Sequence, residues 1–145
     1  MKLLNKNRAW LVVLAVTLIT VMVAGCSSPA AAEAVGSVKQ VTPQAVAGRL
    51  PEDLANGVIL LDVRTPEEWA QDGHIEGATL IPLQELPDRA AQELPKDAEI
   101  IVYCRSGNRS AQAASYLVDA GYGDVSDMGG IADWKAAGNE VVYGP

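Results

Sequence analysis

The chain has 145 residues, of which 49% are hydrophobic and 20% are charged. Its 18 acidic residues outnumber its 11 basic residues, which gives a formal net charge of −7 at pH 7. Such a surface repels nucleic acid and anionic lipid headgroups, which argues against both as partners. Because the sequence contains two cysteines, a framework of several disulfides is excluded.

The first 25 residues have the pattern of a secretory signal peptide, since a basic start is followed by an uncharged apolar stretch and then by small residues. The sequence Val23-Ala24-Gly25-Cys26 is similar to the lipobox of bacterial lipoproteins, in which cleavage precedes a cysteine that becomes lipidated. A single membrane-spanning anchor is the alternative, because a spanning helix needs about 20 residues. Both interpretations predict a domain in the cell envelope, on the non-cytoplasmic side of a membrane, and the first anchors it by lipid at Cys26.

Residues 26–36 are expected to form the lipidated cysteine and a flexible tether, because they are rich in Ala, Ser and Pro and have no apolar period. Residues 37–145 have room for one compact domain. Removal of residues 1–25 takes away three basic residues and no acidic ones, which leaves 8 basic residues against 18 acidic ones. An anionic ligand must therefore be attracted by local charge and not by the protein as a whole.

Three short apolar runs in the first half of the domain predict strands. They span residues 38–41, 58–61 and 78–81, and the second run is continuous, which is typical of a strand covered on both faces. Thr65-Pro66-Glu67-Glu68 is a capping box with proline at the first helical position. A helix should therefore begin there and bury Trp69.

The second half of the domain contains the clearest strand and helix signals. Residues 99–103 predict an apolar strand, and residues 111–121 carry an apolar stripe at helical spacing. Residues 125–128 predict a last short strand, and Gly129-Gly130 predicts the start of a short helix with Trp134 facing inward. Strands that alternate with helices indicate an α/β fold with a mainly parallel sheet and with ligands at the strand ends.

Cys104 lies between the end of a predicted strand and the start of a predicted helix. Backbone N–H groups are unpaired at a helix start and the helix dipole favours negative charge there, so the thiol should shift toward the nucleophilic thiolate. The alternative, an inert buried cysteine, does not explain the polar and doubly basic loop that follows. This loop predicts an anion nest of N–H groups with two guanidinium groups beside it, and its residues are Arg105, Ser106, Gly107, Asn108 and Arg109.

Four separated motifs resemble the rhodanese domain in the same order and at similar spacings: Leu61–Trp69, Gly73–Ala78, Tyr103–Ser110 and Gly129–Ile131 with Trp134. The resemblance implies a small α/β fold, with a central five-stranded sheet flanked by helices, and a Cys104 that carries a persulfide during sulfur transfer. The implied partners are a small sulfur-containing anion as donor and a thiol or another nucleophile as acceptor. No cofactor is implied, and we expect a monomer.

The length of the loop separates two related chemistries. Four residues lie between Cys104 and Arg109, which is the short loop that in the rhodanese family accompanies sulfur transfer. The phosphatase-like relatives have one residue more, so phosphoryl transfer is disfavoured here. A further alternative is a weakly or non-catalytic rhodanese module that binds sulfur oxyanions or a partner protein.

Three other polar residues are candidates for supporting roles. His74 is the only histidine and could act as a general base, but a structural role is favoured because a persulfide nucleophile in a nest needs no base. Asp62 and Arg64 lie at a strand end, where they could orient the loop or pair with each other, and a structural role is favoured for them as well. The sequence has no cluster with metal-ligand spacing, so no metal is expected.

Overall fold

The computed structural model describes residues 36–144. The predicted signal peptide, Cys26 and nearly all of the predicted tether lie outside these residues. None of the helices in the described part of the chain is long and apolar enough to cross a membrane.

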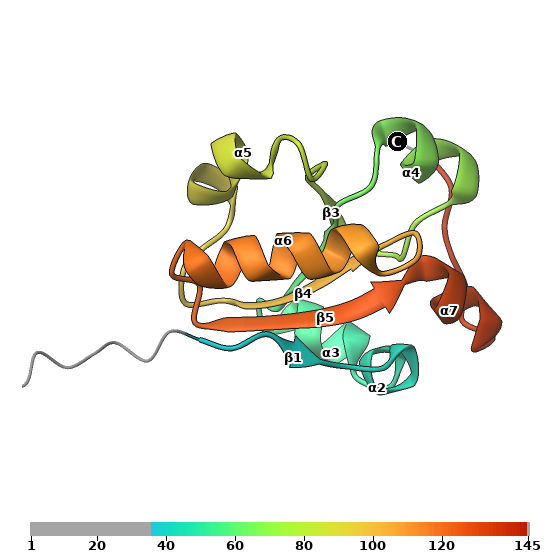
Figure 1. Ribbon diagram of the computed structural model, residues 1–145. Helices are drawn as coiled ribbons and strands as arrows, with labels where there is room; N and C mark the ends of the chain where they lie inside the picture. The colour runs from blue at the N-terminus through green and yellow to red at the C-terminus, as the bar shows by residue number, and fades with distance from the viewer. Residues whose placement is uncertain (1–35, 145) are drawn as a thin grey trace, which may run out of the picture. The chain divides into compact units, whose positions relative to one another are not determined.

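A five-stranded sheet forms the centre of the fold, with the strand order β1-β5-β4-β2-β3 and parallel pairing throughout (Figure 1). The strands are β1 (Lys39–Gln40), β2 (Ile59–Asp62), β3 (Thr79–Leu80), β4 (Glu99–Cys104) and β5 (Asp124–Gly130). This confirms the predicted α/β fold and its five strands. Because the strands are parallel, their carboxyl ends meet at one edge of the sheet.

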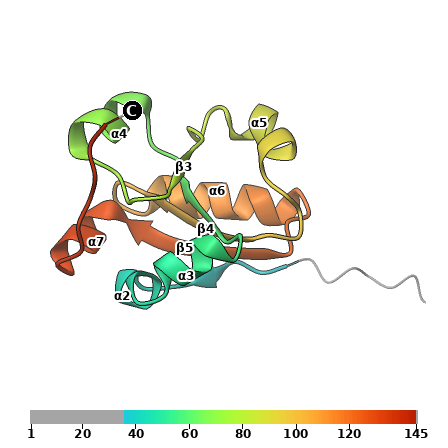
Figure 2. The same cartoon turned by 180° about the vertical axis from the view of Figure 1, so that it is seen from behind.

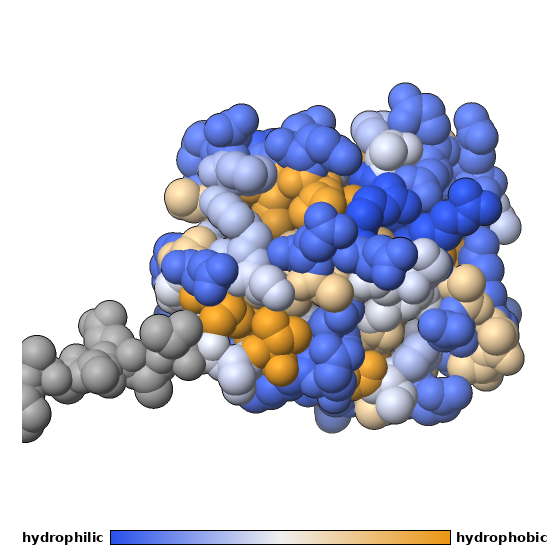
Figure 3. All heavy atoms as spheres, viewed as in Figure 1, coloured by the Kyte–Doolittle hydropathy of each residue, from blue (hydrophilic) through white to orange (hydrophobic). Residues whose placement is uncertain are grey.

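Helices cover both faces of the sheet, as the two opposite views show (Figures 1 and 2). Helices α5 (Leu86–Glu93) and α6 (Asn108–Asp119) lie on one face, and α2 (Pro43–Ala47), α3 (Leu50–Ala55) and α7 (Ile131–Ala136) lie on the other. The remaining helix of the described residues, α4 (Pro66–Asp72), lies beyond the carboxyl ends of the strands. On the face that carries α6, mostly hydrophilic side chains surround an apolar patch between α5 and α6 (Figure 3).

The core divides into two layers because successive strand residues point to opposite faces of the sheet. In β4, Ile100, Val102 and Cys104 pack into the cluster on the α5 and α6 side. Ile101 and Tyr103 pack into the cluster on the α2, α3 and α7 side. Cys104 therefore faces α6, the helix that begins four residues after it.

The capping box is confirmed, whereas the predicted burial of Trp69 is wrong. The Thr65 side chain accepts the Glu68 N–H, the Glu68 carboxylate accepts the Thr65 N–H, and α4 starts at Pro66 as expected. However, α4 buries none of its residues, because it lies at the end of the sheet and not on a face. Trp69 is half-buried and stacks on the ring of His74, with 3.5 Å between the ring centroids.

Strand β5 is longer than predicted, so the two consecutive glycines belong to this strand and not to the start of the helix. It continues through Gly129 and Gly130, and α7 begins only at Ile131. A register shift between Val102 and Tyr103 lets the end of β5 follow β4 as far as the pair Cys104 and Gly130. The glycines therefore close the sheet beside the cysteine.

Candidate active site

Cys104 is the last residue of β4, and the loop after it turns the chain directly into α6. Gly107 forms the N-cap of this helix with a φ of +99°, a backbone conformation that side chains rarely adopt. In this conformation its N–H points back and donates to the Cys104 Sγ over 3.1 Å. The predicted nest is thus closed by the one loop residue that can take this geometry at little cost.

The end of β5 packs against the loop, backbone to backbone. A Cβ atom placed on Gly130 would lie 2.7 Å from the Arg105 carbonyl oxygen. This oxygen also accepts the Ala132 N–H at 3.3 Å. Gly130 is therefore required for close approach, and the strand end and the start of α7 hold the base of the loop in place.

Ser110 is a residue of the site that was not among those predicted from the sequence. It is fully buried in the first turn of α6, and its Oγ lies 3.7 Å from the Cys104 Sγ. The same oxygen lies 2.9 Å from the Gly107 carbonyl oxygen and 3.2 Å from that of Gly129. Its small size and its position six residues after the cysteine were available signals, but the contact itself depends on how β5 packs.

The environment of Cys104 favours the thiolate. Burial, the strongest single influence, opposes ionisation, but hydrogen bonds from the backbone of Ser110, Ser106 and Gly107, together with the hydrogen bond between the cysteine and the Ser110 side chain, outweigh it. The pKa of the Cys104 thiol is therefore lower than its ordinary value. A lowered pKa increases the fraction of the thiolate, which is the form of cysteine that acts as a nucleophile.

Ser110→Ala is expected to raise the pKa of Cys104, because it removes a hydrogen bond that favours the charged sulfur. The rate of alkylation by iodoacetamide, measured against pH, should then rise at a higher pH than in the wild type. Ser106→Ala is the matched control, since Ser106 is exposed and acts on Cys104 through its backbone. Equal alkylation profiles for Ser110→Ala and the wild type would contradict the role of the hydroxyl.

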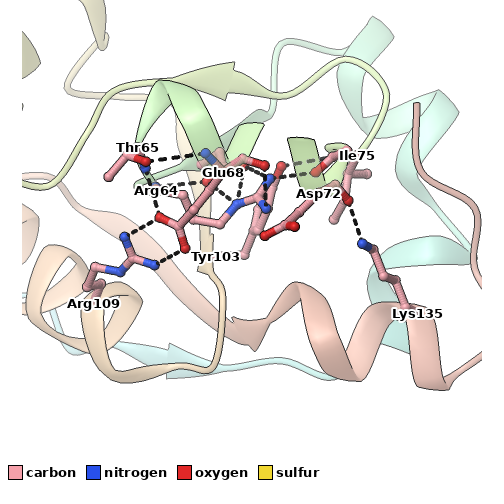
Figure 4. A network of polar contacts seen from close by, with 10 residues as sticks. Arg64, Thr65, Glu68, Asp72, Ile75, Tyr103, Arg109 and Lys135 are labelled. Atoms are coloured by element: carbon pink, nitrogen blue, oxygen red, sulfur yellow. Dashed lines mark hydrogen bonds and ion pairs between the residues drawn. The ribbon is translucent and has the colours of Figure 1, made fainter. Parts of the chain in front are cut away.

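Arg109 does not project freely into the site, because it is paired with Glu68 of α4 (Figure 4). The two Nη atoms of the guanidinium donate to the two carboxylate oxygens of Glu68, each over 2.7 Å. The Arg109 hydrogen bond is the main reason that the pKa of Glu68 falls to about 2. The carboxylate therefore remains charged throughout the range in which a thiol titrates.

Glu68 belongs to the predicted capping box, and in the structure it also has a second role at the site. Its pairing with Arg109 joins residues 41 positions apart in the chain. Arg105, by contrast, is exposed, and its guanidinium has no hydrogen bond or ion pair to any residue within 36–144. Ser106 and Asn108 are also exposed beside it.

Asp62 and Arg64 form a fully buried pair at the end of β2, and neither is hydrogen-bonded to Cys104. The Arg64 Nη2 donates to the Asp62 Oδ2 over 2.7 Å, and the Arg64 Nε donates to both carboxylate oxygens. Arg64 also donates to the carbonyl oxygens of Glu68 and Gly73, which bracket most of α4 (Figure 4). This pair fixes the helix that carries Glu68.

His74 contributes to packing in this structure. Its ring stacks on Trp69, and its backbone exchanges two hydrogen bonds of 2.8 Å with Val142. The His74 Nδ1 is buried and has no hydrogen-bond partner. No hydrogen bond links the histidine to Cys104 in the described residues, which favours the structural role.

Between residues 36 and 144, no three His, Cys, Asp or Glu side chains converge in a way that could hold a metal ion. Cys104 is a free and buried cysteine. A cysteine with a lowered thiol pKa, at the carboxyl end of a parallel strand and beside the N–H groups of a helix start, has the features of a site for covalent catalysis by cysteine. This is the class of site that the fold and its geometry establish.

Comparison with known proteins gives the family. Residues 43–137 match the Rhodanese-like domain, and the chain belongs to the rhodanese sulfurtransferase family. It is 41% identical over 106 residues to a sulfurtransferase of Allochromatium vinosum, and the aligned region covers 72% of this chain and 95% of that protein. It is 42% identical over 74 residues to thiosulfate sulfurtransferase PspE of Escherichia coli, which covers 50% of this chain and 70% of the relative.

The fold also matches solved structures. The crystal structure of the Alr3790 protein from Anabaena superposes with a TM-score of 0.65 at 34% identity and covers 71% of this chain and 91% of that one. The rhodanese resemblance that the four sequence motifs indicated is therefore confirmed. The similarity to a lipoprotein signal concerns residues outside these matches and stays a prediction.

Proposed function

We propose that this protein transfers a sulfane sulfur from a small anionic donor such as thiosulfate, through a persulfide on Cys104, to a thiol acceptor. The observation that carries this proposal is the Gly107 N–H, which donates to the Cys104 Sγ over 3.1 Å and favours the thiolate. The similarity to sulfurtransferases, PspE among them, supports the same reaction class.

The first half of the reaction loads the enzyme. The Cys104 thiolate attacks the outer sulfur of thiosulfate, a new S–S bond forms, and the S–S bond of the donor breaks. Sulfite leaves with the electron pair, and the enzyme retains a persulfide that carries one negative charge. The Gly107 N–H at the start of α6 donates to the Cys104 Sγ, and N–H groups in this position would stabilise the negative charge of the persulfide without reorganisation.

The second half unloads it. The thiolate of the acceptor attacks the outer sulfur of the persulfide, and the bond between this sulfur and Sγ breaks. The acceptor leaves as a persulfide, and Cys104 returns to the thiolate form. No oxidant or reductant is needed beyond the donor and the acceptor, so the cycle balances within the two substrates.

We also propose that the domain works in the cell envelope, anchored by lipid at Cys26. The sequence Val23-Ala24-Gly25-Cys26, which ends the apolar leader, supports this proposal. These residues lie outside the part of the chain that the structure describes.

Intact-mass measurement tests the proposal. Incubation with thiosulfate should add one sulfur atom to the protein and release one equivalent of sulfite, and a thiol such as dithiothreitol should then remove the added sulfur. Protein alkylated beforehand with iodoacetamide is the control and should take up no sulfur. An unchanged mass after incubation, with no sulfite released, would refute sulfur transfer from thiosulfate.

A further inference from the structure

The charges around Cys104 are paired in a way that leaves little attraction for a dianion. Asp62 neutralises Arg64 in the buried pair, and Glu68 neutralises Arg109. Among the arginines of the site, this leaves the charge of Arg105 to oppose that of the Cys104 thiolate. A donor with two negative charges therefore approaches a site with almost no net positive charge, on a chain whose overall charge is negative.

Arg109 is close enough to Cys104 to matter for the donor. The pKa of Arg109 is raised chiefly by its hydrogen bond to Glu68, and the negative charges of Glu68 and of the Cys104 thiolate add to this. The guanidinium and the thiolate therefore act on each other electrostatically. Without Glu68, the full charge of Arg109 would be available to an anion at the cysteine.

The Glu68–Arg109 pair is held in place from several directions. One N–H of each Arg109 Nη is used by a carboxylate oxygen, and the Glu68 Oε2 also accepts the Thr65 N–H over 3.1 Å (Figure 4). The helix that carries Glu68 is attached to Arg64. The side chains of both partners are less than one-third exposed, which limits screening by solvent.

We propose that Glu68 determines donor specificity, and that by neutralising Arg109 it makes the site favour sulfane donors with one negative charge, such as organic thiosulfonates and persulfides, over the thiosulfate dianion. This inference rests on the sulfur transfer proposed above and names its preferred donor class. A thiosulfonate reacts as thiosulfate does: the thiolate takes the outer sulfur, the bond between the two sulfur atoms of the donor breaks, and a sulfinate leaves with the electron pair.

Two donors of different charge test the inference at constant ionic strength. Wild-type protein should show a higher kcat/KM with methanethiosulfonate, which carries one negative charge, than with thiosulfate. Glu68→Gln keeps a side chain suited to the capping box and frees Arg109. It should raise the ratio of the kcat/KM for thiosulfate to that for methanethiosulfonate by about tenfold, the order expected for one nearby charge.

Glu67→Gln is the matched control, because Glu67 is exposed in the same helical turn and is not paired with Arg109. It removes the same charge and should change the ratio by less than about twofold. The double variant Glu68→Gln with Arg109→Gln should return the ratio to the wild-type value, because the freed cation is gone. Circular dichroism of each variant verifies that it is folded.

The results separate the inference from the proposed function. Equal donor ratios for Glu68→Gln and Glu67→Gln would overturn the role of Glu68 while leaving sulfur transfer intact. The role of Glu68 would also be overturned if the wild-type protein had a higher kcat/KM with thiosulfate than with methanethiosulfonate and Glu68→Gln did not increase this preference. If wild-type protein takes sulfur from neither donor, the proposed function fails, and the donor preference fails with it.

Discussion

Cys104→Ser is expected to abolish persulfide formation and to lower sulfur transfer from any donor by at least about a thousandfold. A serine hydroxyl in the same position stays protonated, and the hydrogen bonds that favour a thiolate cannot ionise it at neutral pH. Measurements of sulfite release and of intact mass give the result directly. Retention of sulfite release by this variant would show that the nucleophile lies elsewhere.

The matched control for this experiment is Cys26→Ser in the full-length protein. Cys26 is the other cysteine of the sequence and is predicted to carry lipid, not sulfur. This variant should keep the wild-type kcat/KM while losing attachment to membranes. The pair of variants thus separates the two expected functions of cysteine in this chain, catalysis at residue 104 and anchoring at residue 26.

Cys104→Ser also distinguishes the enzyme from a weakly or non-catalytic module. A binding module would retain affinity for sulfur oxyanions in calorimetry after this substitution, and its wild-type form would show no turnover with any sulfur donor. The observed geometry favours the enzyme. An anion-binding module could use the same N–H groups, but it has no need of a cysteine whose thiol pKa is lowered.

Local chemistry made much of the fold predictable from the sequence. The apolar run before Cys104 specifies a buried strand, and the capping box specifies the start of α4. The end of β5 was not predictable in this way. Gly129 and Gly130 are weak strand formers. A side chain at Gly130 would collide with the backbone of the loop after β4, and Gly129 has a φ of +87° that side chains rarely adopt.

The part of the site that could be predicted consists of residues that lie close together in the sequence. The sequence places Cys104 and Gly107 in one loop, and the role of a small residue with positive φ follows from that placement. The pairing of Glu68 with Arg109 could not be predicted, because it depends on where α4 lies relative to α6. Both arginines of the loop were therefore expected to bind the donor, whereas the structure pairs one of them with a carboxylate.

Substitution of one partner of the buried pair is expected to have the largest effect on stability. Arg64→Met should lower the free energy of unfolding by about 3–5 kcal/mol, because it leaves the Asp62 carboxylate buried without its partner. Asp62→Asn should cost a similar amount, since it leaves the Arg64 cation uncompensated. Such losses approach the whole stability of a typical small domain, so urea titrations should be made at low temperature with the wild type alongside.

The double variant Asp62→Leu with Arg64→Met shows whether the loss in the free energy of unfolding comes from the buried charge that has lost its partner. It should be much more stable than either single variant, because replacing both ions with apolar groups removes the cost of burying a lone charge. Arg89→Met is the control for exposed pairs: Arg89 contacts Glu85 and Glu93 over 2.8 and 2.6 Å but is partly exposed, so its loss should cost less than about 1 kcal/mol. If Arg64→Met cost no more than Arg89→Met, the buried pair would not anchor α4, and the position of Glu68 would have to depend on its capping box and on Arg109 alone.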